Sequence, residues 1–99
     1  MAYVEVHFQD GFEHDRASVR LNGREVWSSA ALHTRTQISY ADQARIEVPE
    51  GTAQLAVEVV GRGAVSVELP AAPRPLYVGV SLIDGRLTCH LQSEPFGYA

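Results

Sequence analysis

The stretch "ASVRLNGREVWS", residues 17–28, decides the fold. Apolar and polar residues alternate on both sides of Asn22-Gly23, and Val19 and Leu21 occupy the apolar positions before this dipeptide. Asn-Gly suits the two positive-φ positions of a type I′ turn, and alternation with a period of two is typical of half-buried strands. The stretch therefore predicts a β-hairpin.

The same alternation continues along nearly the whole chain. No window of a dozen residues has apolar positions at helical spacing, so strands are expected throughout. A second hairpin is predicted at Asp84-Gly85. Together with the hairpin above, the alternating runs cover residues 3–9, 17–28, 32–38, 44–48, 54–60, 64–70 and 76–93.

These runs predict an all-β fold, an antiparallel β-sandwich of about eight or nine short strands in two sheets, immunoglobulin-like or prealbumin-like. The 99 residues are expected to form a single domain, residues 1–99, with residues 94–99 as a C-terminal tail. Residues 70–75, "PAAPRP", are too rich in proline for a sheet interior and are expected to cross between the sheets.

The inward positions of the alternating runs give the predicted core. It consists of Val4, Val6, Phe8, Val19, Leu21, Val26, Ile46, Val48, Leu55, Val57, Val59, Val65, Val67, Leu69, Val78, Val80, Leu82, Leu87, Cys89 and Leu91.

Composition excludes several classes of function. The net charge of −4 and the lack of a basic cluster argue against nucleic acid as a partner. No apolar run approaches the roughly 18 residues of a membrane-spanning helix, and no secretory signal is recognisable. A cytoplasmic location is therefore expected, unless these residues are a module of a longer chain. The single cysteine, Cys89, excludes an internal disulfide and zinc sites built on paired thiolates.

Two segments resemble known small sandwich modules. "VRLNGREVW" and "RIEVPEGTAQLAVEVVG", within residues 18–61, are similar to immunoglobulin-like, prealbumin-like and PEGA-type modules of bacteria. The threonine-proline element that usually follows the Asn-Gly turn in PEGA-type sequences is absent. The resemblance implies a sandwich fold and an accessory role in binding or assembly.

The stretch "HFQDGFEHD", from His7 to Asp15, holds the densest cluster of chemically capable side chains. His7 is expected on the polar face of a strand, and the segment after Asp-Gly is expected to be a solvated polar loop. Because a metal needs at least three converging ligands, no metal is expected here. A metal-binding or hydrolytic protein using His7, His14, His33 and His90 is the least favoured hypothesis.

Neither candidate nucleophile has the surroundings that catalysis requires, so the chain is predicted not to be an enzyme and to need no cofactor. The segment around Ser81 lacks the glycine two places later that a nucleophile elbow contains. Cys89 alternates with Leu87 and Leu91 on an apolar face, where a thiol is expected to be buried and inert.

Aromatic residues are the main candidates for binding. With Val26 assigned to the core, Trp27 is expected to face outward, and Tyr3, Tyr40 and Tyr77 fall on or near outward positions. Phe96 and Tyr98 in the tail are expected to pack onto the domain or onto a neighbour. The candidate binding residues are Trp27, Tyr3, Tyr40, Tyr77, Phe96 and Tyr98.

Two functions are compatible with these patterns. The first is a non-catalytic module that binds another protein or a second copy of itself, as a homo-oligomer, through an edge strand or an aromatic face. The alternative is a small module that binds a carbohydrate or another ligand through its outward aromatic rings.

Overall fold

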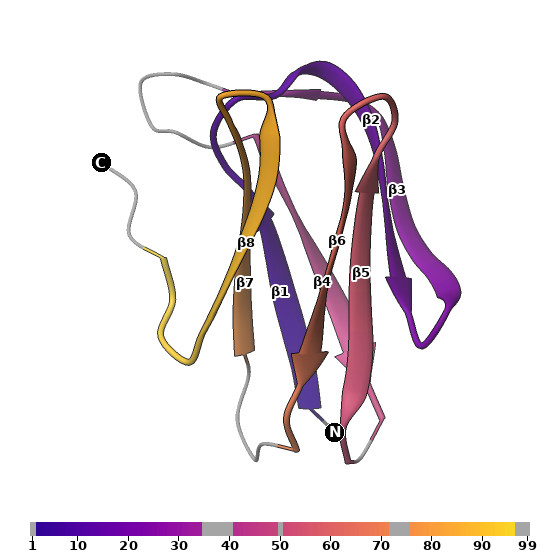
Figure 1. Ribbon diagram of the computed structural model, residues 1–99. Coiled ribbons are helices and arrows are strands. Elements are labelled where there is room, and N and C mark those ends of the chain that lie inside the picture. Colours follow the sequence, from indigo (N-terminus) through magenta and orange to yellow (C-terminus); the bar gives the residue numbers. More distant parts are fainter. Residues whose placement is uncertain (1, 35–40, 50, 72–75, 97–99) are drawn as a thin grey trace.

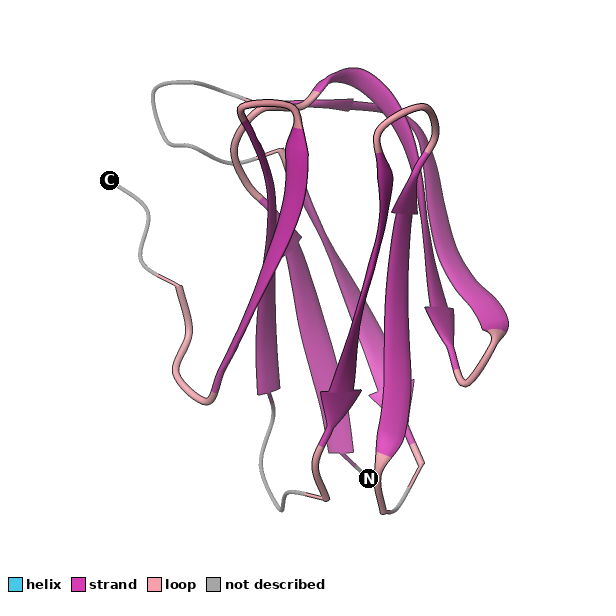
Figure 2. Ribbon diagram, in the orientation of Figure 1, coloured by secondary structure: helices cyan, strands magenta, loops and turns pink. Residues whose placement is uncertain are grey.

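The computed structural model describes residues 2–34, 41–49, 51–71 and 76–96. These residues form strands joined by turns and contain no helix (Figures 1 and 2), which confirms the all-β prediction. No helix capable of crossing a membrane is therefore found in this part of the chain. The strands are β1 (Ala2–Phe8), β2 (Glu13–Leu21), β3 (Arg24–His33), β4 (Asp42–Val48), β5 (Ala53–Val59), β6 (Gly63–Leu69), β7 (Leu76–Ile83) and β8 (Arg86–Gln92).

The strands form two sheets of four strands each. Sheet A has the order β4-β1-β7-β8 and sheet B has the order β3-β2-β5-β6. Neighbouring strands are antiparallel except β1 and β7, which run parallel, so the prediction of a purely antiparallel fold is wrong at this pair. β1 and β7 are far apart in the sequence, and no hairpin turn sets their relative direction.

Both predicted two-residue turns are confirmed. Asn22 and Gly23 have φ values of 52° and 84°, and Asp84 and Gly85 have φ values of 52° and 77°. These left-handed conformations are those that a type I′ turn requires. The proline-rich segment joins β6 of sheet B to β7 of sheet A, as predicted, although residues 72–75 lie outside the described part of the chain.

The two sheets share one hydrophobic core. Val80 of sheet A and Val19 and Leu55 of sheet B are fully buried. The rings of Phe8 on β1 and Trp27 on β3 stack across the sheets, with centroids 5.1 Å apart and planes 19° apart. This arrangement is consistent with a β-sandwich.

The predicted core is wrong at one position, Val26, which is 41 % exposed, whereas Trp27 packs against the core. The cause is a register shift in the β2–β3 hairpin, where Val19 pairs with Trp27 but Arg20 pairs with Glu25. One extra residue on β3 reverses the faces of the residues beyond it. Every other predicted core residue is buried or packs against the core.

The prediction of a solvated loop after Asp10-Gly11 is also wrong, because this segment contains a buried residue and the start of a strand. Phe12 is only 1 % exposed and packs edge-to-face on Phe8, with the ring centroids 5.7 Å apart. Strand β2 begins directly afterwards, at Glu13, and the Asp15 carboxylate accepts the Glu13 backbone N–H at 2.9 Å. The segment therefore belongs to the framework that links sheet A to sheet B.

The strand predicted over residues 32–38 belongs to β3 only at its start, because β3 ends at His33. Thr34 instead ties the end of β3 to the β1–β2 connection. Its hydroxyl accepts the Phe12 backbone N–H at 2.9 Å and donates to the Gln9 carbonyl at 2.6 Å. The remainder of that predicted strand lies outside the described residues.

Candidate functional site

The outer face of sheet A gathers polar and aromatic side chains. Tyr3, Glu5 and His7 alternate along β1 with residues that enter the core. Glu5 lies between Arg45 of β4 and Tyr77 of β7 in the strand register. A strand with one face in the core presents its other side chains together, so the alternation of β1 creates this surface.

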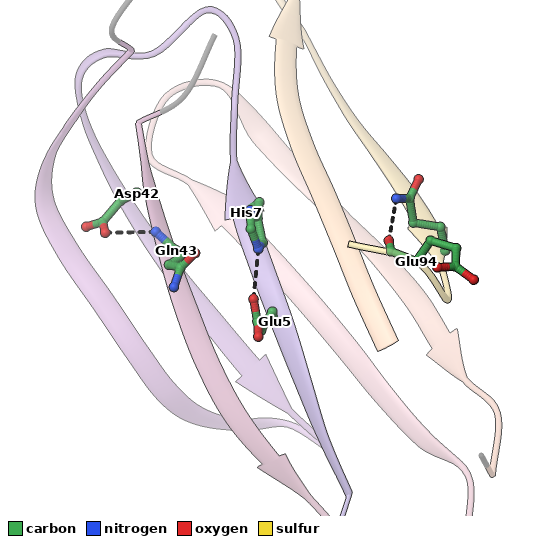
Figure 3. A network of polar contacts seen from close by, with 6 residues as sticks. Glu5, His7, Asp42, Gln43 and Glu94 are labelled. Carbon is green, nitrogen blue, oxygen red and sulfur yellow. Dashed lines mark hydrogen bonds and ion pairs between the residues drawn. The ribbon is translucent and has the colours of Figure 1, made fainter. Parts of the chain in front are cut away.

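Specific contacts order this outer face. The Nε2 atom of His7 lies 3.1 Å from Oε1 of Glu5, and Figure 3 shows the two side chains pointing toward one another along β1. The guanidinium carbon of Arg45 lies 3.6 Å from the centroid of the Tyr3 ring, which is a cation–π contact. Burial, reinforced by the neighbouring Tyr3 and Glu5, raises the pKa of Tyr77.

The C-terminal tail returns to the same face. The Phe96 ring lies 5.2 Å from the His7 ring between centroids, with the planes 55° apart. Its tip also lies beside Gly79 at the middle of β7. Of the two alternatives expected for Phe96, packing onto the domain or onto a neighbour, the structure shows the first.

The predicted binding residues separate into three groups. Tyr3, Tyr77 and Phe96 lie on the outer face of sheet A. Trp27 does not face outward as expected, because it stacks on Phe8 in the core. The two further candidates, Tyr40 and Tyr98, lie outside the described residues.

The histidines are distributed over several surfaces. His7 lies on the polar face of β1 as predicted, but it is only 6 % exposed because the Phe96 ring packs over it. His14 has a left-handed backbone conformation at a register shift in β2. Its ring stacks on the His33 ring, with the ring centroids 4.8 Å apart. His90 is exposed on β8. Among the described residues no three or more potential ligands converge as a metal site would require.

A second surface lies where the edge strands β6 and β8 approach one another across the core. Both strands pair with their inner neighbours over seven residues without a bulge. Cys89 belongs here and is half-buried, whereas the sequence predicted a buried thiol. An edge strand has a partner on one side only, which leaves its inward residues partly open. The half-buried apolar residues along this side are Val65, Val67, Leu87, Cys89 and Leu91.

The opposite side of the molecule, formed by β3 and β4, is more irregular and more highly charged than the side formed by β6 and β8, where each strand carries one exposed acidic or arginine side chain, Glu68 and Arg86. The β2–β3 ladder carries three register shifts. β4 presents Asp42, Arg45 and Glu47 as exposed charges. Bulges and charges are the devices by which natural sheets prevent edge-to-edge pairing. Of these two features, only the charges of β4 can be recognised in the sequence, because the register shifts of β3 depend on its pairing with β2.

The chain was also compared with known proteins. No family model, curated protein or solved structure matches it. Function is therefore inferred from the surfaces described above.

The two nucleophiles considered from the sequence lie on the neighbouring strands β7 and β8. Ser81 is buried on β7, where its Oγ accepts the Asp10 backbone N–H at 3.2 Å. Cys89 lies on the inward face of β8, packed against the core.

Proposed function

We propose that this chain is a non-catalytic β-sandwich module that binds a second copy of itself through the side formed by β6 and β8. The observation that carries the proposal is the pair of adjacent, bulge-free edge strands lined by half-buried apolar side chains. Such edges present backbone N–H and C=O groups that can extend a sheet, and the apolar row would be covered in the same contact.

The sequence of β8 supports a second copy as the occupant. If two β8 strands pair antiparallel about Cys89, Leu87 of one copy lies opposite Leu91 of the other. Arg86 then lies opposite Gln92. This register places an apolar residue against an apolar residue and sets no like charges opposite one another.

Strand β6 is compatible with the same symmetry. Antiparallel pairing of two β6 strands about Ser66 sets Val65 opposite Val67 and Glu68 opposite Ala64. No like charges then lie directly opposite one another, so neither edge opposes a two-fold contact electrostatically.

The strand order supports the prealbumin-like alternative over the immunoglobulin-like one. In an immunoglobulin sandwich the first two strands pair in one sheet. Here β1 pairs with β4 and β7 in sheet A, whereas β2 pairs with β3 and β5 in sheet B. The finer fold proposed is therefore prealbumin-like.

Binding of a carbohydrate or small ligand by outward rings is less favoured. The largest candidate ring, Trp27, is occupied by its stack on Phe8. Tyr3 and Tyr77 remain on the outer face of sheet A, but Arg45 already covers the Tyr3 ring.

The proposal is tested with lysines placed on the side formed by β6 and β8, and a control lysine is placed on β3 at the opposite side. Ser66→Lys combined with Thr88→Lys puts positive charges at the outward face of β6 and β8 without entering the core. Because like charges then approach across the two-fold contact, the dissociation constant of the dimer should rise about tenfold or more, equivalent to ~1.4 kcal/mol. Size-exclusion chromatography with light scattering, run over a series of concentrations, measures this constant.

The matched control is Ser28→Lys, which makes the same kind of change at an exposed position of β3. This control should dimerise like the natural chain. The proposal is wrong if the natural chain stays at its monomer mass of 10.8 kDa at every concentration, or if Ser28→Lys weakens the dimer as much as the double variant.

A further inference from the structure

Gly79 occupies a position whose backbone does not need glycine. The other glycines of the described residues have positive φ values, whereas Gly79 lies within β7 and is absent from that left-handed group. Glycine inside a strand lowers stability relative to alanine and often marks the close approach of another group. The space above Gly79 therefore has a specific occupant.

Two side chains fill that space. A Cβ atom built on Gly79 would lie 2.7 Å from Oε1 of Gln9 and 2.9 Å from Cζ of Phe96. The same Phe96 ring packs on His7, and both Gly79 and His7 are buried although they belong to the outer face of sheet A. His7, Gln9 and Gly79 thus form a seat for one aromatic ring, which we call the Phe96 seat.

The ring in the seat comes from a short tether. β8 ends at Gln92, and only residues 93–95 separate it from Phe96. The contact is therefore local to the tail and does not join the two sheets. A group held in this way can leave and return without unfolding the sandwich.

We propose that the Phe96 seat is an acceptor for an aromatic side chain presented by an extended peptide of another protein, and that the tail is its tethered competitor. The Phe96 ring that occupies the seat defines the chemistry of the partner. The partner must present a phenyl-type ring that lies over the Cα of Gly79 and packs against the imidazole of His7. This surface lies on the outer face of sheet A and does not depend on dimerisation through β6 and β8.

Tethering sets the expected strength of competition. A short flexible tether holds its end at an effective concentration on the order of millimolar. If the tail occupies the seat about 90 % of the time, an outside peptide binds about tenfold more weakly than it binds an empty seat. Removing the Phe96 ring should therefore strengthen peptide binding, although it removes an aromatic residue from the protein.

The probe is a C-terminally amidated peptide of residues 92–96, QSEPF, with QSEPA as its control. It is titrated into the natural chain, Phe96→Ala and the double variant Phe96→Ala/Gly79→Ala, while the His7 ring proton resonances are followed by NMR. Alanine at position 79 meets only the ends of flexible side chains, so the fold should persist while the seat is filled. Thermal unfolding of each variant verifies this.

We expect QSEPF to shift the His7 resonances of Phe96→Ala, to bind the natural chain about tenfold more weakly, and not to bind the double variant. QSEPA should bind none of them. The proposal is overturned if Phe96→Ala fails to bind QSEPF at concentrations of about 10 mM, well above the effective concentration of the tether. Equal binding by the double variant, or by the natural chain, overturns it as well.

Discussion

Replacing Gly11 with alanine is expected to lower the melting temperature by about 12–24 °C, a loss of ~3 kcal/mol. Gly11 has a φ of 91°, and a Cβ there would overlap the backbone carbonyl oxygen of Leu82. The neighbouring chain cannot retreat easily, because the Leu82 N–H donates to the Asp10 carbonyl at 2.7 Å. Thermal unfolding followed by circular dichroism measures the shift.

The matched control is Gly23→Ala. Gly23 also has a positive φ, 84°, but a Cβ there meets no heavy atom within 4 Å. Only the left-handed backbone is penalised, so the loss should be ~1 kcal/mol, or about 4–8 °C. Equal shifts for the two variants would show that the close approach of Gly11 to β7 does not exist in solution.

Replacing Val57 with aspartate is expected to unfold the domain. Val57 is 2 % exposed and pairs with Val19 and Val65 at the centre of sheet B. An ionised carboxylate without a partner in this apolar site costs at least about 5 kcal/mol, which is as large as the whole stability of a domain at the lower end of the usual ~5–15 kcal/mol range. Loss of the cooperative thermal transition is the expected observation.

Val60→Asp provides the comparison for this variant. Val60 directly follows the same strand but is 62 % exposed, so aspartate there should change stability by less than about 0.5 kcal/mol. If Val57→Asp melts at the same temperature as Val60→Asp, the inward face of β5 has been assigned incorrectly.

The sequence predicts the features of the fold that local chemistry determines. The Asn22-Gly23 and Asp84-Gly85 turns follow from residues that tolerate a left-handed backbone. Alternation identifies the buried face of β1 and β5, and the same alternation sends Tyr3 and Tyr77 outward. These inferences need only neighbouring residues, so no knowledge of distant partners is required.

Features that depend on distant partners are not visible in the sequence. The extra residue that turns Trp27 into the core is a property of the β2–β3 register, and the parallel pairing of β1 with β7 joins segments far apart in the chain. The sequence does indicate that the apolar ring of Phe96 should pack against another surface. Its seat beside Gly79 becomes visible only when the tail is placed against β1 and β7.

The most direct test of the proposed function is amide hydrogen exchange of the natural chain at low and high protein concentration, measured strand by strand. Pairing through β6 and β8 predicts that exchange in these two strands slows as the concentration rises, because their outward N–H groups gain partners. Exchange in β3 and β4 should stay the same. Concentration-independent exchange in β6 and β8, or slowing confined to β3 and β4, would contradict the proposed dimer.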